Sequence, residues 1–340
     1  MKRKLFALLF VICIGSANFM YGQKNIIYYE PEATYQKGLE LFNKEKFNAA
    51  QELFYKTINA IEDIQSEIRI SAEYYAAICA VELYNINAEY KLIKFITEHS
   101  ENSKVKLANF QLGKLQYRQK KYHGAVKAFE SVDIYDLNDE ELLDYYFKSG
   151  YSYFIIKDFE NAKKQFIEII DNESKYFSSA NYYYAHIAYN EKNYETAMKS
   201  FGKIENDENF KLIVPYYIAQ IYFLQGNYNE VIKYAHPLLD TGNTKRSIEV
   251  ARMLGESYFR MGKYASSIQF LEKYQRKATT SVSRQDYYEL GYAYYKSGAN
   301  YSKAVSNFEN AISGTEDSLL QNTYYLLGDC YLKIIIKNSQ

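Results

Sequence analysis

The side chains that could perform catalysis or bind a metal are few and scattered in this chain. The four histidines, His99, His123, His186 and His236, lie far apart in the sequence. None has a cysteine or carboxylate at the spacing of a zinc site, and no serine stands in a nucleophile-elbow context. Each histidine is therefore interpreted as a polar residue of the surface or of a groove, and we expect neither a bound metal nor a catalytic histidine.

The other reactive groups lead to the same expectation. Adjacent acids such as Glu140 and Glu141 point to different sides of a helix, which disfavours an acid–base site made of two carboxylates. No glycine-rich phosphate loop occurs in the sequence. Cys79 and Cys330 are expected to be buried thiols, with an intermolecular bridge as the minor alternative. We therefore predict no enzyme activity, no catalytic residue and no cofactor.

One pattern recurs along the chain: a small residue, an aromatic nine positions later, an alanine three further on and a phenylalanine four beyond that. Gly113, Tyr122, Ala125 and Phe129 define it. Recurrence at a fixed period indicates a stacked array of repeats. The other copies are Gly38/Phe47/Ala50/Phe54, Gly150/Phe159/Ala162/Phe166, Ala185/Tyr194/Ala197/Phe201, Ala219/Tyr228/Val231/Ala235, Gly255/Tyr264/Ser267/Leu271, the longer Gly291/Tyr301/Ala304/Phe308 and the degenerate Ala76/Asn85/Ala88/Leu92.

Each repeat has the length and periodicity of two short helices. Successive small residues are 34 to 38 positions apart, and residues 107–118 and 122–132 carry apolar side chains at a helical period. Gly226, Gly262 and Gly298 suit the left-handed residue just after a first helix. The small and alanine columns should let two backbones approach closely. The phenylalanines should fill the space beneath the next hairpin, because no hairpin buries its apolar face alone.

Two local features concern the start of one first helix and the end of the array. In the acidic stretch at residues 136–144, Asn138 or Asp139 is expected to cap a first helix. Gly328 begins a ninth first helix without a second half, which would leave residues 334–336 without a covering helix.

The spacing resembles that of the tetratricopeptide repeat family over residues 31–340. The chain departs from the family pattern in having no tryptophan and in lacking the proline that often closes a repeat. The resemblance implies an all-α, right-handed superhelical solenoid of about eight to nine helix-turn-helix repeats, the last one incomplete. It also implies that the first helix of each repeat lines the concave side. Similar exported repeat proteins occur in bacterial envelopes.

Residues 1–22 have the features of a secretory signal peptide. Basic residues at positions 2–4 precede a short apolar run, and Gly22 is a small residue at a plausible cleavage site. An uncleaved membrane anchor and lipid attachment at Cys13 are the alternatives. Residues 23–30 form a short segment before the solenoid. We expect an exported protein, periplasmic or associated with the cell envelope, that contacts a membrane only through the leader or a partner.

The charge balance disfavours a nucleic-acid partner. The chain carries 41 basic and 41 acidic side chains, and removal of the leader takes away three basic ones, which leaves a formal net charge of −3. No stretch builds a phosphate-binding surface.

Two columns of the first helices are rich in aromatic residues, and a variable column lies between them. If the first helices line the concave side, the rings form the walls of a groove and the variable residues supply selectivity. Packing between neighbouring first helices is the competing interpretation. The predicted partner-binding groove consists of Phe147, Tyr151, Phe154, Tyr182, His186, Tyr189, Tyr216, Gln220, Phe223, Tyr288, Tyr292 and Tyr295.

These observations predict an exported protein–protein interaction scaffold that binds a partner peptide or helix of apolar or aromatic character. Some members of the family grip a C-terminal carboxylate with repeated asparagine and lysine or arginine, and this chain lacks that pattern, so we do not expect such a clamp. Two alternatives stay open: a glycan-binding envelope protein, and the N-terminal part of a longer envelope assembly protein. The sequence predicts no particular oligomeric state.

Overall fold

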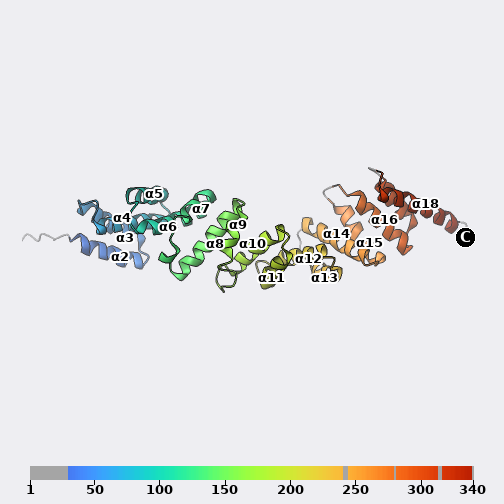
Figure 1. Cartoon of the computed structure of the whole chain (residues 1–340), viewed down its shortest axis with the longest axis horizontal. Coiled ribbons are helices and arrows are strands. Elements are labelled where there is room, and N and C mark those ends of the chain that lie inside the picture. The colour runs from blue at the N-terminus through green and yellow to red at the C-terminus, as the bar shows by residue number, and fades with distance from the viewer. Residues whose placement is uncertain (1–29, 240–243, 279–280, 313–315, 339–340) are drawn as a thin grey trace, which may run out of the picture. The chain divides into compact units, whose positions relative to one another are not determined.

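The computed structural model describes residues 30–239, 244–278, 281–312 and 316–338. These residues form seventeen α-helices and two short 3-10 helices, and no strand occurs among them (Figure 1). The chain divides into two compact units, residues 1–145 and 146–340. The predicted signal peptide lies outside the described residues.

The helices pair into helix-turn-helix hairpins in chain order. The first unit holds α2 (Pro31–Asn43) with α3 (Phe47–Ala60), α4 (Glu67–Glu82) with α5 (Ala88–Glu98), α6 (Lys104–Arg118) with α7 (Tyr122–Phe129), and the 3-10 helix η1 (Ile134–Asp136). Next come α8 (Asp139–Ile155), which runs through the boundary between the units, α9 (Phe159–Phe166), α10 (Phe177–Asn190) with α11 (Tyr194–Ile204), and α12 (Val214–Leu224) with α13 (Tyr228–Ala235). The chain continues with η2 (His236–Leu238), α14 (Thr244–Arg260) with α15 (Tyr264–Lys277), α16 (Arg284–Ser297) with α17 (Tyr301–Ala311), and α18 (Ser318–Asn338). This order confirms the predicted all-α fold of helix-turn-helix repeats.

Each turn between the two helices of a hairpin contains one residue in the left-handed region. Gly226, Gly262 and Gly298 have φ of 75°, 72° and 65°, which confirms their predicted role. In the other five turns this residue carries a side chain, and the sequence pattern did not reveal it. These residues are Glu45, Tyr84, Lys120, Lys157 and Lys192, with φ of 57°, 56°, 60°, 67° and 62°.

The small and alanine columns bring the two helices of a hairpin into close contact, as predicted. Ala125 and Ala162 have no exposed surface. A β-carbon added at Gly113 would lie 2.7 Å from ring carbons of Phe129. Carbon atoms that are not bonded pack at about 3.5–4.0 Å, so a side chain at this position would have to displace the ring.

We expect Gly113→Ala to lower the free energy of unfolding by about 1–2 kcal/mol, because displacement of Phe129 outweighs the better helix propensity of alanine. Gly202 in α11 is the matched control, since a β-carbon there meets nothing within 4 Å. Gly202→Ala should raise the free energy of unfolding by up to about 1 kcal/mol. Urea denaturation followed by far-ultraviolet circular dichroism measures both variants. Equal changes at the two positions would contradict the close packing.

Phenylalanines of the second helices stack on tyrosines of the next first helix. The pairs are Phe54 and Tyr75 at a ring-centroid distance of 5.5 Å, Phe166 and Tyr183 at 5.9 Å, and Phe201 and Tyr217 at 5.3 Å. All three phenylalanines are fully buried. Each of these hairpins therefore covers the apolar face of its neighbour, as the repeat pattern predicted.

The second repeat departs from the predicted register by one residue. In the other turns the left-handed residue follows the small residue by seven positions, as Lys120 follows Gly113. In this repeat the left-handed residue is Tyr84, which follows Ala77 at that spacing. The assignment of Ala76 as the small residue is therefore wrong. Ala77 packs in the cluster that contains α5, whereas Ala76 packs toward α3.

Asn138 caps α8 through a reciprocal pair of hydrogen bonds. The Glu141 backbone N–H donates to Asn138 Oδ1 at 3.0 Å, and the Asn138 backbone N–H donates to Glu141 Oε2 at 3.1 Å. Cys79 and Cys330 are buried and free, as predicted. Among the described helices, none combines the length and the apolar character that a bilayer crossing requires.

The last helix, α18, packs on α16 and α17, and no further described helix follows it. Gly328 stands at its small position, but a β-carbon there would meet nothing within 4 Å. Tyr325, Leu332 and Ile336 are exposed on the same helix. The face that a second helix covers in the other repeats is therefore open within the described part of the chain.

Candidate functional site

The twelve predicted groove residues lie on α8, α10, α12 and α16. Eleven of them are half-buried, and Phe147 is buried. We call the surface formed by these twelve side chains the aromatic face.

On α8, α10 and α12 the aromatic face is a continuous series of ring contacts. The Phe154 ring centroid lies 5.8 Å from that of His186. His186 lies 5.6 Å from Tyr217, and Tyr217 lies 5.4 Å from Tyr189. These contacts join three successive first helices, so the structure brings together two predicted residues that are 32 positions apart in the chain, Phe154 and His186.

Polar groups connect the same rings. The Tyr189 hydroxyl donates to Gln220 Oε1 at 3.2 Å, and Gln220 Nε2 donates to the Tyr216 hydroxyl at 2.9 Å. The guanidinium of Arg246 lies over the Tyr216 ring at 5.2 Å, at one end of this series. Gln220, which belongs to the variable column, is thus hydrogen-bonded to one tyrosine on each side.

The predicted residues of α16 form a second group. Tyr292 lies 5.9 Å from Tyr288 and 6.3 Å from Tyr295, and it also contacts the Phe259 ring of α14 at 5.7 Å. The Tyr295 hydroxyl donates to Asp329 of α18 at 2.7 Å. Phe223 belongs to neither group. Its ring packs against Tyr228 of α13, with the two ring centroids 6.2 Å apart.

Sequence reasoning missed Tyr183 and Tyr217, which link neighbouring first helices within the aromatic face. The Tyr183 ring contacts Phe154 at 4.9 Å and Tyr151 at 5.0 Å. Tyr217 contacts His186 and Tyr189, as described above. The signal that could have revealed them is the doubled tyrosine, since each directly follows a predicted groove tyrosine.

Burial disfavours the charged forms of four titratable groups of the aromatic face. It raises the pKa of the Tyr182, Tyr189 and Tyr216 hydroxyls above their ordinary value, because the phenolate would lose its hydration. It lowers the pKa of the His186 imidazole for the corresponding reason. The face therefore offers neutral rings, hydroxyls and an amide, a set suited to binding uncharged groups by stacking and hydrogen bonding.

One histidine differs from its predicted surface or groove position. His99 is only 9% exposed, and its Nε2 lies 2.6 Å from Glu73 Oε2. Glu98 is close enough that one ligand atom from each of the three residues lies within 4.8 Å of the others. The sequence search missed this group because Glu73 precedes His99 by 26 positions. Arg69 Nε donates to the other Glu73 oxygen at 3.1 Å, so we interpret the group as an ion-pair network.

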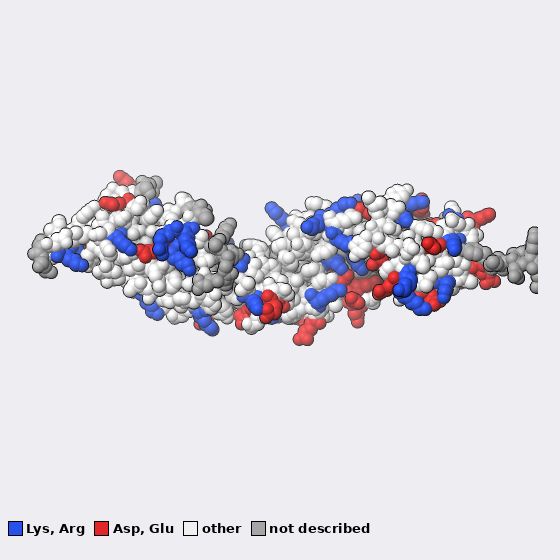
Figure 2. All heavy atoms as spheres, turned by 180° about the vertical axis from the view of Figure 1, so that it is seen from behind, with Lys and Arg blue, Asp and Glu red and all other residues white. Residues whose placement is uncertain are grey.

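Charged side chains of both signs are interspersed with uncharged surface on the face that Figure 2 shows. Charged side chains also pair between neighbouring repeats, as Lys163 does with Glu191 at 2.7 Å and Lys203 with Asp171 at 2.5 Å. Exposed pairs of this kind contribute up to about 1 kcal/mol each, so the apolar contacts dominate the packing between repeats.

The family model of the tetratricopeptide repeat matches residues 107–134 and 250–281 of this chain. The first segment covers the α6–α7 hairpin and the second covers most of α14 and α15. The match supports the tetratricopeptide repeat family. Proteins of this family are generally non-enzymatic scaffolds that bind other proteins, which suggests the same broad role for this chain.

Solved structures of tetratricopeptide repeat proteins are similar to this chain at low sequence identity. A protein from Parabacteroides merdae is 18% identical over 77% of this chain and 98% of its own, with a TM-score of 0.40. The C-terminal part of a repeat protein from Cytophaga hutchinsonii is 17% identical over 84% of this chain and 98% of its own, with a TM-score of 0.39. No curated protein matches the chain.

Proposed function

We propose that this chain is an exported scaffold that binds a partner peptide or helix on its aromatic face. The observation that carries the proposal is the continuous series of half-buried rings across α8, α10 and α12, with His186 and Gln220 between them. Rings of this kind supply apolar contact area at a low cost in side-chain entropy, and their polar atoms fix the register of a bound chain.

The chemistry of the face favours a partner with apolar or aromatic side chains. Its titratable groups are neutral, so binding should depend little on salt concentration. Gln220 and His186 offer hydrogen-bonding groups for the backbone or the polar side chains of the partner. An affinity that falls steeply with salt concentration would instead indicate that the partner binds through a charged motif.

Site-specific photocrosslinking tests where the partner binds. A benzoylphenylalanine placed at Phe223 lies on the aromatic face and keeps an aromatic side chain there, and one placed at Gly202 on the second helix α11 is the matched control. In the native host, we expect a discrete adduct from position 223 and none of the same mass from position 202. Adducts of equal yield from both positions, or none from position 223, would overturn the proposed face.

The double variant His186→Ala/Gln220→Ala should weaken binding of the crosslinked partner at least about tenfold, because it removes two polar groups of the face and the ring that joins Phe154 to Tyr217. Gln225→Ala, in the exposed turn before α13, is the control and should bind like the wild type. Isothermal titration calorimetry measures both. Unchanged affinity of the double variant would show that His186 and Gln220 take no part in binding and would contradict the proposed face.

Export is a separate part of the proposal and rests on residues 1–22. Fusion of this segment to alkaline phosphatase, which is active only after export, tests it directly. We expect activity from the fusion and none when positions 2–4 and the apolar run are deleted. An inactive full-length leader fusion would remove the exported location from the proposal without affecting the aromatic face.

A further inference from the structure

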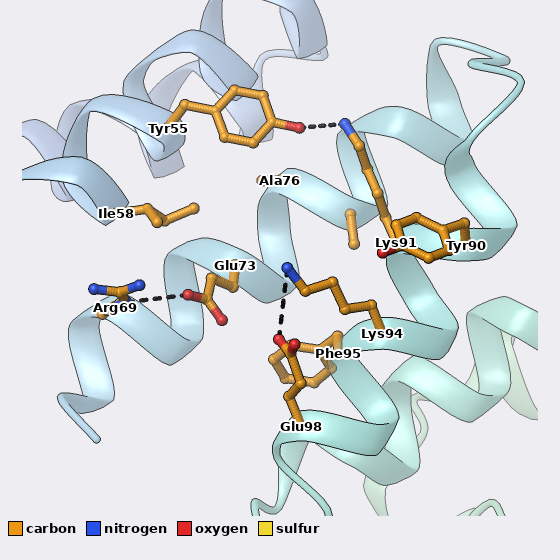
Figure 3. Close-up of a pocket in the computed structure, with 11 residues that line it drawn as sticks. Tyr55, Ile58, Arg69, Glu73, Ala76, Tyr90, Lys91, Lys94, Phe95 and Glu98 are labelled. Atoms are coloured by element: carbon orange, nitrogen blue, oxygen red, sulfur yellow. Dashed lines mark hydrogen bonds and ion pairs between the residues drawn. The ribbon is translucent and has the colours of Figure 1, made fainter. Parts of the chain in front are cut away.

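A pocket opens in the first unit between the second helices α3 and α5, and none of its lining residues belongs to the aromatic face. It has a volume of about 300 Å³. Figure 3 shows the side chains that line it: Tyr55 and Ile58 come from α3, Ala76 comes from α4, and Tyr90, Lys91, Lys94, Phe95 and Glu98 come from α5. Ala77 and Phe95 complete the apolar part of the lining.

Three other repeats carry a large apolar side chain where the second repeat has a small one. The position just before the small residue is Leu112, Leu254 or Leu290 in those repeats, and these side chains are buried. In the second repeat the corresponding residue is Ala76, once the register is set by Ala77. Ala76 lines the pocket, so its short side chain leaves space between α3 and α5.

The rim of the pocket carries charged groups, and all but one are paired. Arg69 Nε lies 3.1 Å from Glu73 Oε1, and Lys94 Nζ lies 3.8 Å from Glu98 Oε2. Lys91 instead donates to the Tyr55 hydroxyl and lies 5.0 Å from the centre of that ring. It makes no ion pair with a carboxylate among the described residues, so the mouth of the pocket carries one uncompensated positive charge.

Exposed apolar side chains surround the same hairpin. Ile86, Tyr90 and Ile93 are all exposed on α5 or on the turn that precedes it. Tyr90 also lines the pocket, so exposed apolar surface reaches its edge, as is typical of a protein-interaction surface.

We propose that this pocket binds a partner peptide through one large apolar side chain that is adjacent to a carboxylate residue. The apolar side chain enters the space lined by Ala76 and Ala77, and the carboxylate pairs with the Lys91 ammonium. The volume of about 300 Å³ lies at the lower end of the range of about 300–1,000 Å³ for ligand pockets and accommodates a side chain of this size. This surface is independent of the binding proposed for the aromatic face.

The floor of the pocket provides its own reporter. In the full chain labelled with carbon-13 in alanine methyl groups, Ala77 reports occupancy by nuclear magnetic resonance and Ala197 in α11 is the internal control. The probe is an acetylated, amidated glycine–serine octapeptide with aspartate followed by leucine at its centre. We expect a saturable shift of the Ala77 methyl signal and none of Ala197. Peptides with aspartate–alanine or lysine–leucine at the centre should bind at least about tenfold more weakly.

Ala76→Leu places in the pocket the side chain that other repeats carry, and it should abolish the Ala77 shift. Ala60→Leu, at an exposed position of α3, is the matched control and should bind like the wild type. Lys91→Glu should reverse the preference, so that the lysine–leucine peptide binds more tightly than the aspartate–leucine peptide. Because Lys91 lies at the rim, Lys91→Glu should leave the packing of the hairpin intact. This variant therefore tests the proposed pairing with the carboxylate even if Ala76→Leu alters the fold. The absence of a saturable Ala77 shift in the wild type, or an unchanged preference in Lys91→Glu, would overturn the proposal.

Discussion

Phe201→Ala is expected to lower the free energy of unfolding by about 3–5 kcal/mol, among the largest effects of any single substitution in this chain. Phe201 has no exposed surface, and its ring stacks on Tyr217 at 5.3 Å with an interplanar angle of 7°. It belongs to the cluster that also contains Ile204 and Ile218. The substitution would leave a cavity at the junction of two hairpins, where each hairpin depends on its neighbour.

Phe201→Leu is the matched control for this prediction. Leu271 fills the same position of another repeat and is buried there, so leucine is compatible with the hairpin. We expect a cost below about 1.5 kcal/mol for this variant. Native-state hydrogen exchange measures the local effect, because protection should fall in α10, α11 and α12 more than in α2 and α3. Equal costs for alanine and leucine, or a loss of protection spread evenly along the chain, would contradict the nearest-neighbour account.

The second large effect is a pH dependence at Glu289. Its side chain is 2% exposed, and burial raises the pKa of this carboxyl group from 4.5 to about 7. Below pH 4.5 the group is neutral in both the folded and the unfolded chain. Between this pH and about pH 7 the unfolded chain loses the proton while the folded chain keeps it, so the free energy of unfolding falls as the pH rises. A shift of this size corresponds to about 3 kcal/mol.

Glu289→Gln should remove this dependence, because an amide cannot ionise and its oxygen can still accept the hydrogen bond that Gln285 donates to Glu289 at 2.8 Å. Relative to the wild type, the variant should gain about 3 kcal/mol of stability between about pH 4 and pH 8. Glu208→Gln, at a side chain that is 82% exposed, is the control and should follow the wild-type pH profile. Urea midpoints across this range test the pair. Parallel profiles for Glu289→Gln and the wild type would contradict the raised pKa.

The hairpins, the close contact at Gly113 and the three glycine turns could be predicted from the sequence because they depend on local properties. A helical period of apolar residues, a missing side chain and a glycine after a helix each constrain the backbone within a few residues. The left-handed conformation of Lys120 and Lys157 was not predicted, because residues with side chains rarely adopt positive φ. Backbone hydrogen bonds hold these turns: the N–H groups of Lys121 and Asp158 donate to the carbonyl oxygens of Gln116 at 2.8 Å and Tyr153 at 2.9 Å.

The parts of the sites that sequence reasoning missed depend on contacts between distant residues. The partners of Phe201 and His99, namely Tyr217 and Glu73, lie on other helices, and no local pattern connects them. The register of the second repeat was missed because Ala77 and Ala88 are eleven positions apart, whereas Gly113 and Ala125 are twelve apart, and a fixed spacing cannot detect this difference. The pocket lined by Ala76 depends on this register, so it could not be predicted from the sequence pattern.

The rings of the aromatic face also determine how this chain can be observed. The chain has 39 tyrosines and no tryptophan, so its ultraviolet emission comes from phenols alone. The ring centroid of Tyr217 lies 6.3 Å from that of Tyr182 and 5.4 Å from that of Tyr189. These distances are short enough for excitation energy to pass along the series. A single indole in a candidate peptide would then act as the terminal acceptor, and its sensitised emission would follow docking without any dye or label on either molecule.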